Sequence, residues 1–334
     1  MGTGRRPLHG LVAAVFTPMR DDGRLHLDLV PEVVERLIDR GITGLYVCGS
    51  TGEGPLLTDG ERREVATAYV AAANGRLPVA VQVGHASVAA SRKLAEHAQA
   101  IGADAISATP PTYFKPQNVD EVIACMVDVA SGAPSLPFFY YHIPSVTGVD
   151  VDVAELLSRG SDGVPNLAGV KFSSPEVHAF AGVDLERFDV MFGVDEMLLS
   201  GLVAGAHGAV GSTYNLFPEL YQEAMAALTS GDFEAARQLQ QVAARLVGRL
   251  SRDRSLPFLK ASMAFTGLPV GPTRLPLRSV DASELACLRA DCVAAGWLSA
   301  FRGEGPSVQV RSTSLEEPVG DSGDSNGGVK QLRP

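Results

Sequence analysis

The sequence predicts an α/β fold, a (β/α)8 TIM barrel with additional C-terminal helices. Eight short apolar runs rich in β-branched residues alternate with longer amphipathic segments, as strands and helices alternate in βα units. Near-continuous apolar strands suit a sheet that is buried on both faces, and the 46% of apolar residues suffice for a large core. The expected strands are Leu11–Phe16, Gly44–Cys48, Val79–Val83, Ala105–Ala108, Pro137–Tyr141, Leu167–Phe172, Val190–Phe192 and Ala209–Val210.

The helix boundaries carry signals of their own. Thr58 and Glu61 form a capping-box pattern, and Ser174-Pro175-Glu176 is typical of a helix start. Gly41 and Gly102 follow helical runs, as C-terminal stops do. Further helical patterns follow the eighth strand at Pro218–Leu228, Asp232–Leu250, Leu256–Phe265 and Ala282–Ala300. They exceed what closing the barrel requires, so we expect an appended helical layer.

A single domain is expected over residues 8–302, because no second core and no repeat beyond the βα alternation is visible. From residue 303 to residue 334 the chain is polar and rich in Gly, Ser and Pro, which predicts a disordered tail. The competing fold, an open doubly wound sheet, usually has a Gly-rich dinucleotide turn after its first strand. Here Phe16-Thr17-Pro18 stands at that point, which also argues against a nucleotide-dependent oxidoreductase.

The formal charge of −10 argues against nucleic acid or an anionic membrane as partner, but leaves an anionic substrate open. No apolar stretch reaches the length of a membrane span, and Leu11–Phe16 is too short for a signal peptide, so we expect a soluble, cytoplasmic protein. Histidines in ligand spacing are absent from the sequence, so no metal is expected. The cysteines form no paired motif and are expected to be reduced core thiols: Cys48, Cys125, Cys287 and Cys292.

Lys171 stands out among the five lysines because it ends the apolar run of the expected sixth strand. A lysine there points into the barrel near its C-terminal rim, where barrel enzymes place their chemistry. Burial favours the neutral amine, which attacks a ketone. The alternative interpretation, a rim lysine paired with a carboxylate, remains open on position alone.

The fifth strand ends in Tyr140-Tyr141-His142, and strand alternation puts the two tyrosines on opposite faces. The inward one could relay protons near Lys171. The sequence does not fix the register, and packing is the commoner role of a strand aromatic.

Three further strand exits carry polar groups. Gly49-Ser50-Thr51-Gly52-Glu53 offers two hydroxyls and free backbone N–H groups, which suit a carboxylate, although such turns also merely reverse a chain. Asp195 and Glu196 follow the seventh strand and suit a neutral polyol. The alternative is that they are favourable charges at a helix N-terminus. The run from Gly211 to Asn215 leaves the eighth strand and could complete a polyol site.

Five motifs in order, each at a strand end, resemble the pyruvate-dependent class I aldolases related to dihydrodipicolinate synthase. The resemblance covers roughly residues 8–300, and within the family the sialic acid lyase branch is most similar. The motifs are Gly49-Ser50-Thr51-Gly52-Glu53, Tyr140-Tyr141-His142-Ile143-Pro144, Gly169-Val170-Lys171-Phe172-Ser173-Ser174, Phe192-Gly193-Val194-Asp195-Glu196 and Gly208-Ala209-Val210-Gly211-Ser212-Thr213-Tyr214-Asn215.

The resemblance implies a role for each matching residue. Lys171 resembles the Schiff-base lysine and Tyr141 the proton-shuttling tyrosine. Ser50 and Thr51 resemble the carboxylate-binding pair, with Ser50 also hydrogen-bonded to the phenol. Tyr113 resembles a tyrosine that completes the site near a subunit contact. The sugar-hydroxyl contacts are implied to be Ser173, Gly193, Asp195, Glu196 and Ser212. The family further implies a homotetramer that uses pyruvate and a 2-keto sugar acid, without a cofactor.

The choice of branch depends on Val146. The synthase branch has an arginine at that position for a second carboxylate, and a site without this guanidinium binds a dicarboxylic intermediate poorly. The lyase branch has an apolar residue there and a Gly-x-Asp-Glu run, as this chain does. His142 replaces an asparagine found in some members, which leaves the fine specificity open.

The resemblance therefore implies cleavage of N-acetylneuraminate to N-acetylmannosamine and pyruvate. Another aldolase or dehydratase of this family, acting on a different 2-keto sugar acid, is the nearest alternative. A non-catalytic barrel that senses a ligand is the alternative from another class, and it predicts no Schiff base.

Overall fold

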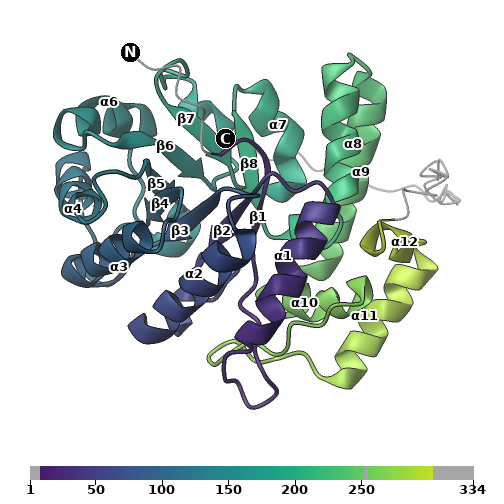
Figure 1. Ribbon diagram of the computed structural model, residues 1–334. Helices are drawn as coiled ribbons and strands as arrows, with labels where there is room; N and C mark the ends of the chain where they lie inside the picture. The colour runs from purple at the N-terminus through teal and green to yellow at the C-terminus, as the bar shows by residue number, and fades with distance from the viewer. Residues whose placement is uncertain (1–7, 252–254, 304–334) are drawn as a thin grey trace, which may run out of the picture.

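The computed structural model describes residues 8–251 and 255–303 of the chain. All eight expected strands are present, and they form one closed parallel barrel in chain order (Figure 1). The strands are β1 (Gly10–Ala14), β2 (Gly44–Val47), β3 (Val79–Gln82), β4 (Ala105–Ala108), β5 (Phe138–His142), β6 (Leu167–Phe172), β7 (Asp189–Phe192) and β8 (Gly208–Gly211). The predicted TIM barrel is thereby confirmed. The expected tail beyond residue 303 lies outside the described residues.

Helices surround the barrel, as the amphipathic segments predict. They are α1 (Val30–Asp39), α2 (Asp59–Ala73), α3 (Val88–Ala100), α4 (Val119–Ser131), α5 (Pro144–Thr147), α6 (Val153–Gly163), α7 (Leu198–Val203) and α8 (Pro218–Thr229). Thr58 caps α2 in the predicted capping box with Glu61. Gly41 and Gly102 have positive φ just beyond α1 and α3, as C-terminal stops do. Within the described ranges, no helix has the length and apolar character needed to cross a membrane.

The core has two layers, because successive residues of a strand face opposite sides of the sheet. Outward residues such as Val47 and Val170 pack against the helices in the larger cluster. Inward residues such as Val12, Tyr46 and Met191 fill the barrel in a smaller one. A side chain on the inward set near a strand's C-terminal end therefore reaches the rim of the barrel, away from the helices.

The expected helical layer follows the barrel, with two corrections to its boundaries. The elements are α9 (Phe233–Leu250), α10 (Ser255–Ala261), the 3-10 helix η6 (Ser262–Thr266), α11 (Ala282–Ala294) and α12 (Leu298–Phe301). The run Leu256–Phe265 tightens to 3-10 geometry halfway, and Ala282–Ala300 is broken at Gly296, whose φ is +72°. The layer lies beside α1 (Figure 1), where Arg40 binds Glu219 of α8 and the carbonyl of Ala300.

Two sequence expectations were wrong. Ser174 caps no α-helix, since only the 3-10 helix η3 (Val177–Phe180) follows. Beyond it the Asp184 carboxylate accepts two nearby backbone N–H groups, a local alternative to helical bonding. The cysteines are free thiols, but they are not all in the core: Cys48 and Cys292 are buried, Cys125 is half-buried and Cys287 is exposed on the outer face of α11.

Gly169 lies where β6 packs closely against the backbone of β7, so a substitution there measures how much space the barrel leaves between these strands. An added Cβ at Gly169 would lie 1.9 Å from the Asp189 carbonyl oxygen on the neighbouring strand. Gly169→Ala is therefore expected to lower the free energy of unfolding by about 1–3 kcal/mol in urea denaturation. Gly248 is the matched control, because it lies in α9 with open space around its Cβ position. Gly248→Ala should raise the same quantity by about 0.5–1 kcal/mol, and a loss at both positions would contradict this account of Gly169.

Candidate active site

Lys171 lies inside the barrel near the C-terminal end of β6 and is 5% exposed. Its Nζ is 3.8 Å from the centroid of the Tyr141 ring and 5.2 Å from that of Tyr46. It also donates a hydrogen bond of 3.0 Å to the Ser173 hydroxyl. No carboxylate lies within ion-pair distance of this amine in the described part of the chain, in contrast to the rim pairing that the sequence left open.

The pairing of β5 with β6 brings Tyr141 level with Lys171. Phe138 pairs with Leu167, but Phe139 pairs with Gly169, so Ala168 is an extra residue on β6. After this shift, Tyr141 and Lys171 are direct neighbours on the inward face. Tyr140 faces outward into the helix-side core, and its hydroxyl has no partner among the described residues. Tyr141 is thus the inward tyrosine of the pair.

The phenol of Tyr141 is polarised by its neighbours. Burial acts to raise the pKa of this phenol, and the charge of Lys171 acts to lower it. Hydrogen bonds with Lys171, Ser50 and Ser173 lower it further, so its net pKa lies below the ordinary value of 10. The environment of Tyr46 acts in the opposite direction, because burial raises the pKa of that phenol well above 10. The two tyrosines beside Lys171 therefore differ as acids, and Tyr141 is the one suited to exchange a proton.

The turn after β2 brings its hydroxyls to the same rim. Ser50 reaches the Tyr141 phenol, while the Thr51 hydroxyl lies 2.6 Å from the Ser212 hydroxyl beyond β8. The turn is bracketed by Cys48 and Glu53, two non-glycine residues with φ of +59° and +55°. Gly54 follows it, and an added Cβ there would lie 1.9 Å from the Cys48 carbonyl oxygen. The backbone is therefore tightly folded, and it presents the two hydroxyls toward the barrel axis.

The predicted polyol group is only partly assembled around Lys171. Ser173 contacts the amine directly, and Gly193 leaves it room, since a Cβ there would lie 2.1 Å from the Ser173 hydroxyl oxygen. Glu196 is exposed at the rim. The sugar contacts of Ser173, Gly193 and Glu196 remain predictions.

Asp195 has a role that the sequence did not predict. Its Oδ2 accepts hydrogen bonds from the Thr213 backbone N–H and hydroxyl at 2.9 and 2.6 Å. The Thr213 hydroxyl in turn lies 2.7 Å from the Tyr221 hydroxyl. Burial raises the pKa of Asp195, although the Thr213 hydrogen bonds act against the rise. The buried carboxylate therefore fixes the loop that carries Ser212, and its contact with a sugar stays a prediction.

Tyr113 is not brought to Lys171 within one chain. It lies on the loop after β4, is 82% exposed and packs edge-to-face against Phe114, which is 85% exposed. Its assignment to the site stays a prediction that depends on a second copy of the chain.

One residue near the Lys171 amine, Tyr46, was missed from the sequence. Tyr46 lies on the inward face of β2, and its hydroxyl donates a 3.1 Å hydrogen bond to Ser107 on β4. The available signal was a lone tyrosine in an otherwise aliphatic strand, but packing explains such a residue equally well. Metal binding is not indicated by the side chains, since no cluster of three or more His, Cys, Asp or Glu occurs in residues 8–251 and 255–303.

The chain is similar over most of its length to proteins named N-acetylneuraminate lyase or dihydrodipicolinate synthetase. N-acetylneuraminate lyase A of Xenopus laevis is 40% identical over 282 residues, which are 83% of this chain and 92% of that protein. The structure of Proteus mirabilis N-acetylneuraminate lyase aligns with a TM-score of 0.84 at 35% identity, covering 87% of this chain and 99% of the other. A putative dihydrodipicolinate synthetase from Pseudomonas aeruginosa aligns with a TM-score of 0.80 at 30% identity, covering 88% and 100%.

The two solved structures have the same fold as this chain, but their names describe different enzymes. The profile of the dihydrodipicolinate synthetase family matches residues 7–295. With that match, and with relatives at 40% identity that it covers almost entirely, the chain belongs to the dihydrodipicolinate synthetase family.

Proposed function

We propose that this chain is a Schiff-base aldolase that reversibly cleaves N-acetylneuraminate to N-acetylmannosamine and pyruvate. The main support is the distance of 3.8 Å between the Lys171 Nζ and the centroid of the Tyr141 ring. The pKa of the Tyr141 phenol is lowered. A nucleophilic amine beside a phenol of this kind supplies both groups that an imine-forming aldolase requires. We further propose a cytoplasmic homotetramer that uses no cofactor; the exposed ring pair of Tyr113 and Phe114 supports a contact between copies.

Each step uses a group that lies at the rim. The neutral amine of Lys171 attacks the C2 carbonyl of the open-chain keto acid, and loss of water gives an iminium. The Ser50 and Thr51 turn holds the substrate carboxylate. Tyr141 accepts the proton of the C4 hydroxyl, the C3–C4 bond breaks and its electron pair moves into the iminium to form an enamine. The sugar aldehyde leaves. Protonation of the enamine at C3 and hydrolysis then release pyruvate and regenerate the amine.

The choice of substrate rests on different observations. Val146 is apolar and 67% exposed, at the position where the synthase branch has an arginine for a second carboxylate. The polar rim residues Glu196 and Ser212 offer groups that can hydrogen-bond to sugar hydroxyls. The relatives named N-acetylneuraminate lyase at 40% identity support the same choice.

Borohydride trapping tests the nucleophile. Reduction in the presence of pyruvate should inactivate the enzyme and add the mass of the reduced adduct to the peptide that contains Lys171. Lys260 is a built-in comparison, because it is also a buried lysine but is bound to a carboxylate. Lys171→Met should abolish both trapping and cleavage. An adduct on the Lys260 peptide, or activity in Lys171→Met, would refute the assignment.

Tyr141→Phe tests the proton transfer. The substitution should lower kcat by about 10²–10⁴-fold while pyruvate trapping at Lys171 continues. Because the pKa of Tyr141 is lowered, the phenolate forms at a pH below 10, and kcat should rise with pH through that range. The iminium formed on Lys171 is also positively charged, so it attracts the Tyr141 phenolate and keeps the pKa of this phenol lowered during the reaction.

Tyr140→Phe is the matched control for this variant. It removes the hydroxyl of the next residue, which faces away from the barrel axis and has no partner in the described part of the chain. Activity and its pH profile should stay within about twofold of the parent. The role of Tyr141 would be wrong if the two variants behaved alike, or if the rise with pH survived in Tyr141→Phe.

A panel of substrates tests specificity. N-acetylneuraminate should be cleaved with release of stoichiometric pyruvate, measured with lactate dehydrogenase and NADH. Condensation of pyruvate with aspartate semialdehyde, the reaction of the synthase branch, should be slower by about 100-fold or more because one guanidinium contact is missing. Faster turnover of another 2-keto sugar acid would shift the assignment to a different aldolase or dehydratase of the family.

A further inference from the structure

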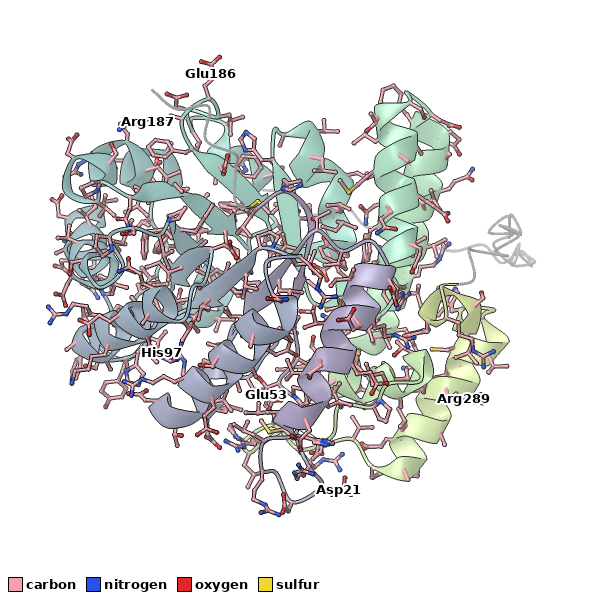
Figure 2. The ribbon with its side chains drawn as sticks, in the orientation of Figure 1. Asp21, Glu53, His97, Glu186, Arg187 and Arg289 are labelled. Carbon is pink, nitrogen blue, oxygen red and sulfur yellow. The ribbon has the colours of Figure 1, made fainter. Side chains whose placement is uncertain are left out.

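A buried ion pair joins the turn after β2 to the helices beyond the barrel. The Lys260 Nζ of α10 donates to Oε1 of Glu53 at 2.6 Å, and the side chains are 1% and 0% exposed. The other carboxylate oxygen accepts the backbone N–H of Arg274 at 2.8 Å. Figure 2 marks Glu53 within the body of the molecule, in contrast to Glu186 and Arg187, which project from its periphery.

Glu53 is the last residue of the turn that carries Ser50 and Thr51. Its left-handed backbone is strained for a residue with a side chain, and such a conformation persists only where the surroundings hold it. The Lys260 and Arg274 contacts provide that restraint from one side. On the other side, the Thr17 hydroxyl donates to the carbonyl of Gly52 at 2.6 Å. The pair therefore acts on the same backbone segment that presents the two hydroxyls.

The pair also sets the charge of this turn. A carboxylate substrate bound at Ser50 and Thr51 is repelled by any uncompensated negative charge nearby, and burial strengthens the repulsion because little water screens it. Lys260 compensates the charge of Glu53. Burial lowers the pKa of Lys260, but the charge of Glu53 and their hydrogen bond act against the loss of its proton.

We propose that Lys260 is a positioning residue: through Glu53 it holds and neutralises the turn that binds the keto-acid carboxylate, a role that rests on the Schiff-base reaction proposed above. The C-terminal helical layer thereby contributes to affinity for the substrate without touching it. The role predicts an effect on carboxylate recognition, which a purely stabilising contact does not.

The test compares pyruvate with pyruvamide, its uncharged analogue, in borohydride trapping of the full chain. Lys260→Met should raise the half-saturating pyruvate concentration about tenfold, in line with a lost charge-assisted contact. The value for pyruvamide and the trapping rate at saturation should change by less than about threefold. In the double variant Glu53→Gln/Lys260→Met, which removes both charges, the pyruvate value should return to within about threefold of the parent. Lys260→Gln, which keeps a donor for Glu53, should give an intermediate rise and allows the comparison if Lys260→Met is not folded.

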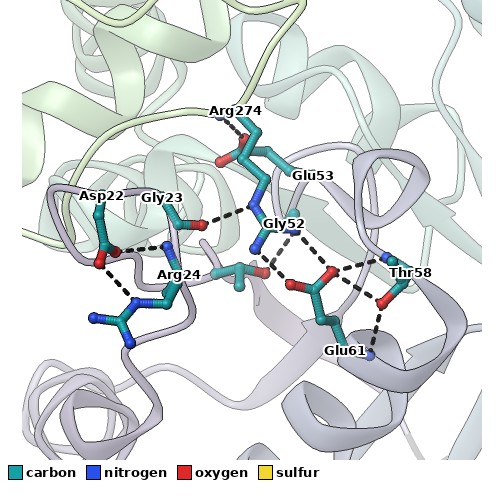
Figure 3. A network of polar contacts seen from close by, with 9 residues as sticks. Asp22, Gly23, Arg24, Gly52, Glu53, Thr58, Glu61 and Arg274 are labelled. Atoms are coloured by element: carbon teal, nitrogen blue, oxygen red, sulfur yellow. Dashed lines mark hydrogen bonds and ion pairs between the residues drawn. The ribbon is translucent and has the colours of Figure 1, made fainter.

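Glu61→Gln is the matched control. Glu61 belongs to the same network, since it binds the Arg274 guanidinium at 2.5 and 2.8 Å, but it contacts α2 and its cap and not the turn (Figure 3). This variant should lower Tm and leave the half-saturating pyruvate concentration unchanged.

Three results would overturn the proposal: an unchanged pyruvate value in Lys260→Met, an equal rise for pyruvamide, or the same rise in Glu61→Gln. A parent chain that traps no pyruvate would overturn the Schiff-base reaction and this role together. A parent that traps pyruvate but does not cleave N-acetylneuraminate would overturn only the choice of substrate.

Discussion

The contact between Lys171 and Tyr141 depends on a one-residue shift in the pairing of two parallel strands. If Ala168 paired with Phe139 in an unshifted register, Tyr141 would pair with Val170, and Lys171 would pair with His142 and face the helices. A shift of one residue moves every later side chain to the other face of a sheet. Strict alternation from Leu167 would direct the Lys171 side chain toward the helices. The bulge directs its amine toward the barrel axis instead. Gly169 permits this bulge, because a side chain at this position would collide with the carbonyl oxygen of Asp189 on β7.

The two buried lysines show how the surroundings divide one residue type between two tasks. Lys171 contacts a hydroxyl and two aromatic faces, so its amine stays available to a substrate that enters from the rim. Lys260 contacts a carboxylate that is as buried as itself, and its amine is committed. Breaking such a pair on one side leaves a buried charge without compensation, so buried pairs resist single substitutions. The presence of the Glu53 carboxylate, and not the type of secondary structure, distinguishes the surroundings of Lys260 from those of Lys171.

The strand pattern predicted the barrel well because burial on both faces leaves a strong apolar signal in each of eight short runs. The same uniformity hid the register, since near-continuous apolar strands do not show which residue faces inward. Tyr141 was therefore identified by resemblance and not by alternation. Contacts between distant segments were also hidden: Lys260 looked like an ordinary helical lysine, and Asp195 like a helix-terminal or sugar-binding acid. Its hydrogen bonds with Thr213 depend on how the exits of β7 and β8 meet, which no local pattern encodes.

The pairing of Glu53 with Lys260 also constrains the order in which the molecule can be completed. The partners are 207 positions apart, and all but the first two strands of the barrel lie between them. Contacts between residues so far apart in the chain form late, because the entropy cost of closing the intervening segment comes before the contact can stabilise the fold. On the ribosome, the eighth strand emerges before α10, so a nascent chain can close its barrel while Glu53 still lacks its counter-charge. The turn after β2, for which carboxylate binding is proposed above, is then the last part of the rim to gain its restraint, because a partly synthesised barrel lacks the contact with Lys260 until α10 has docked.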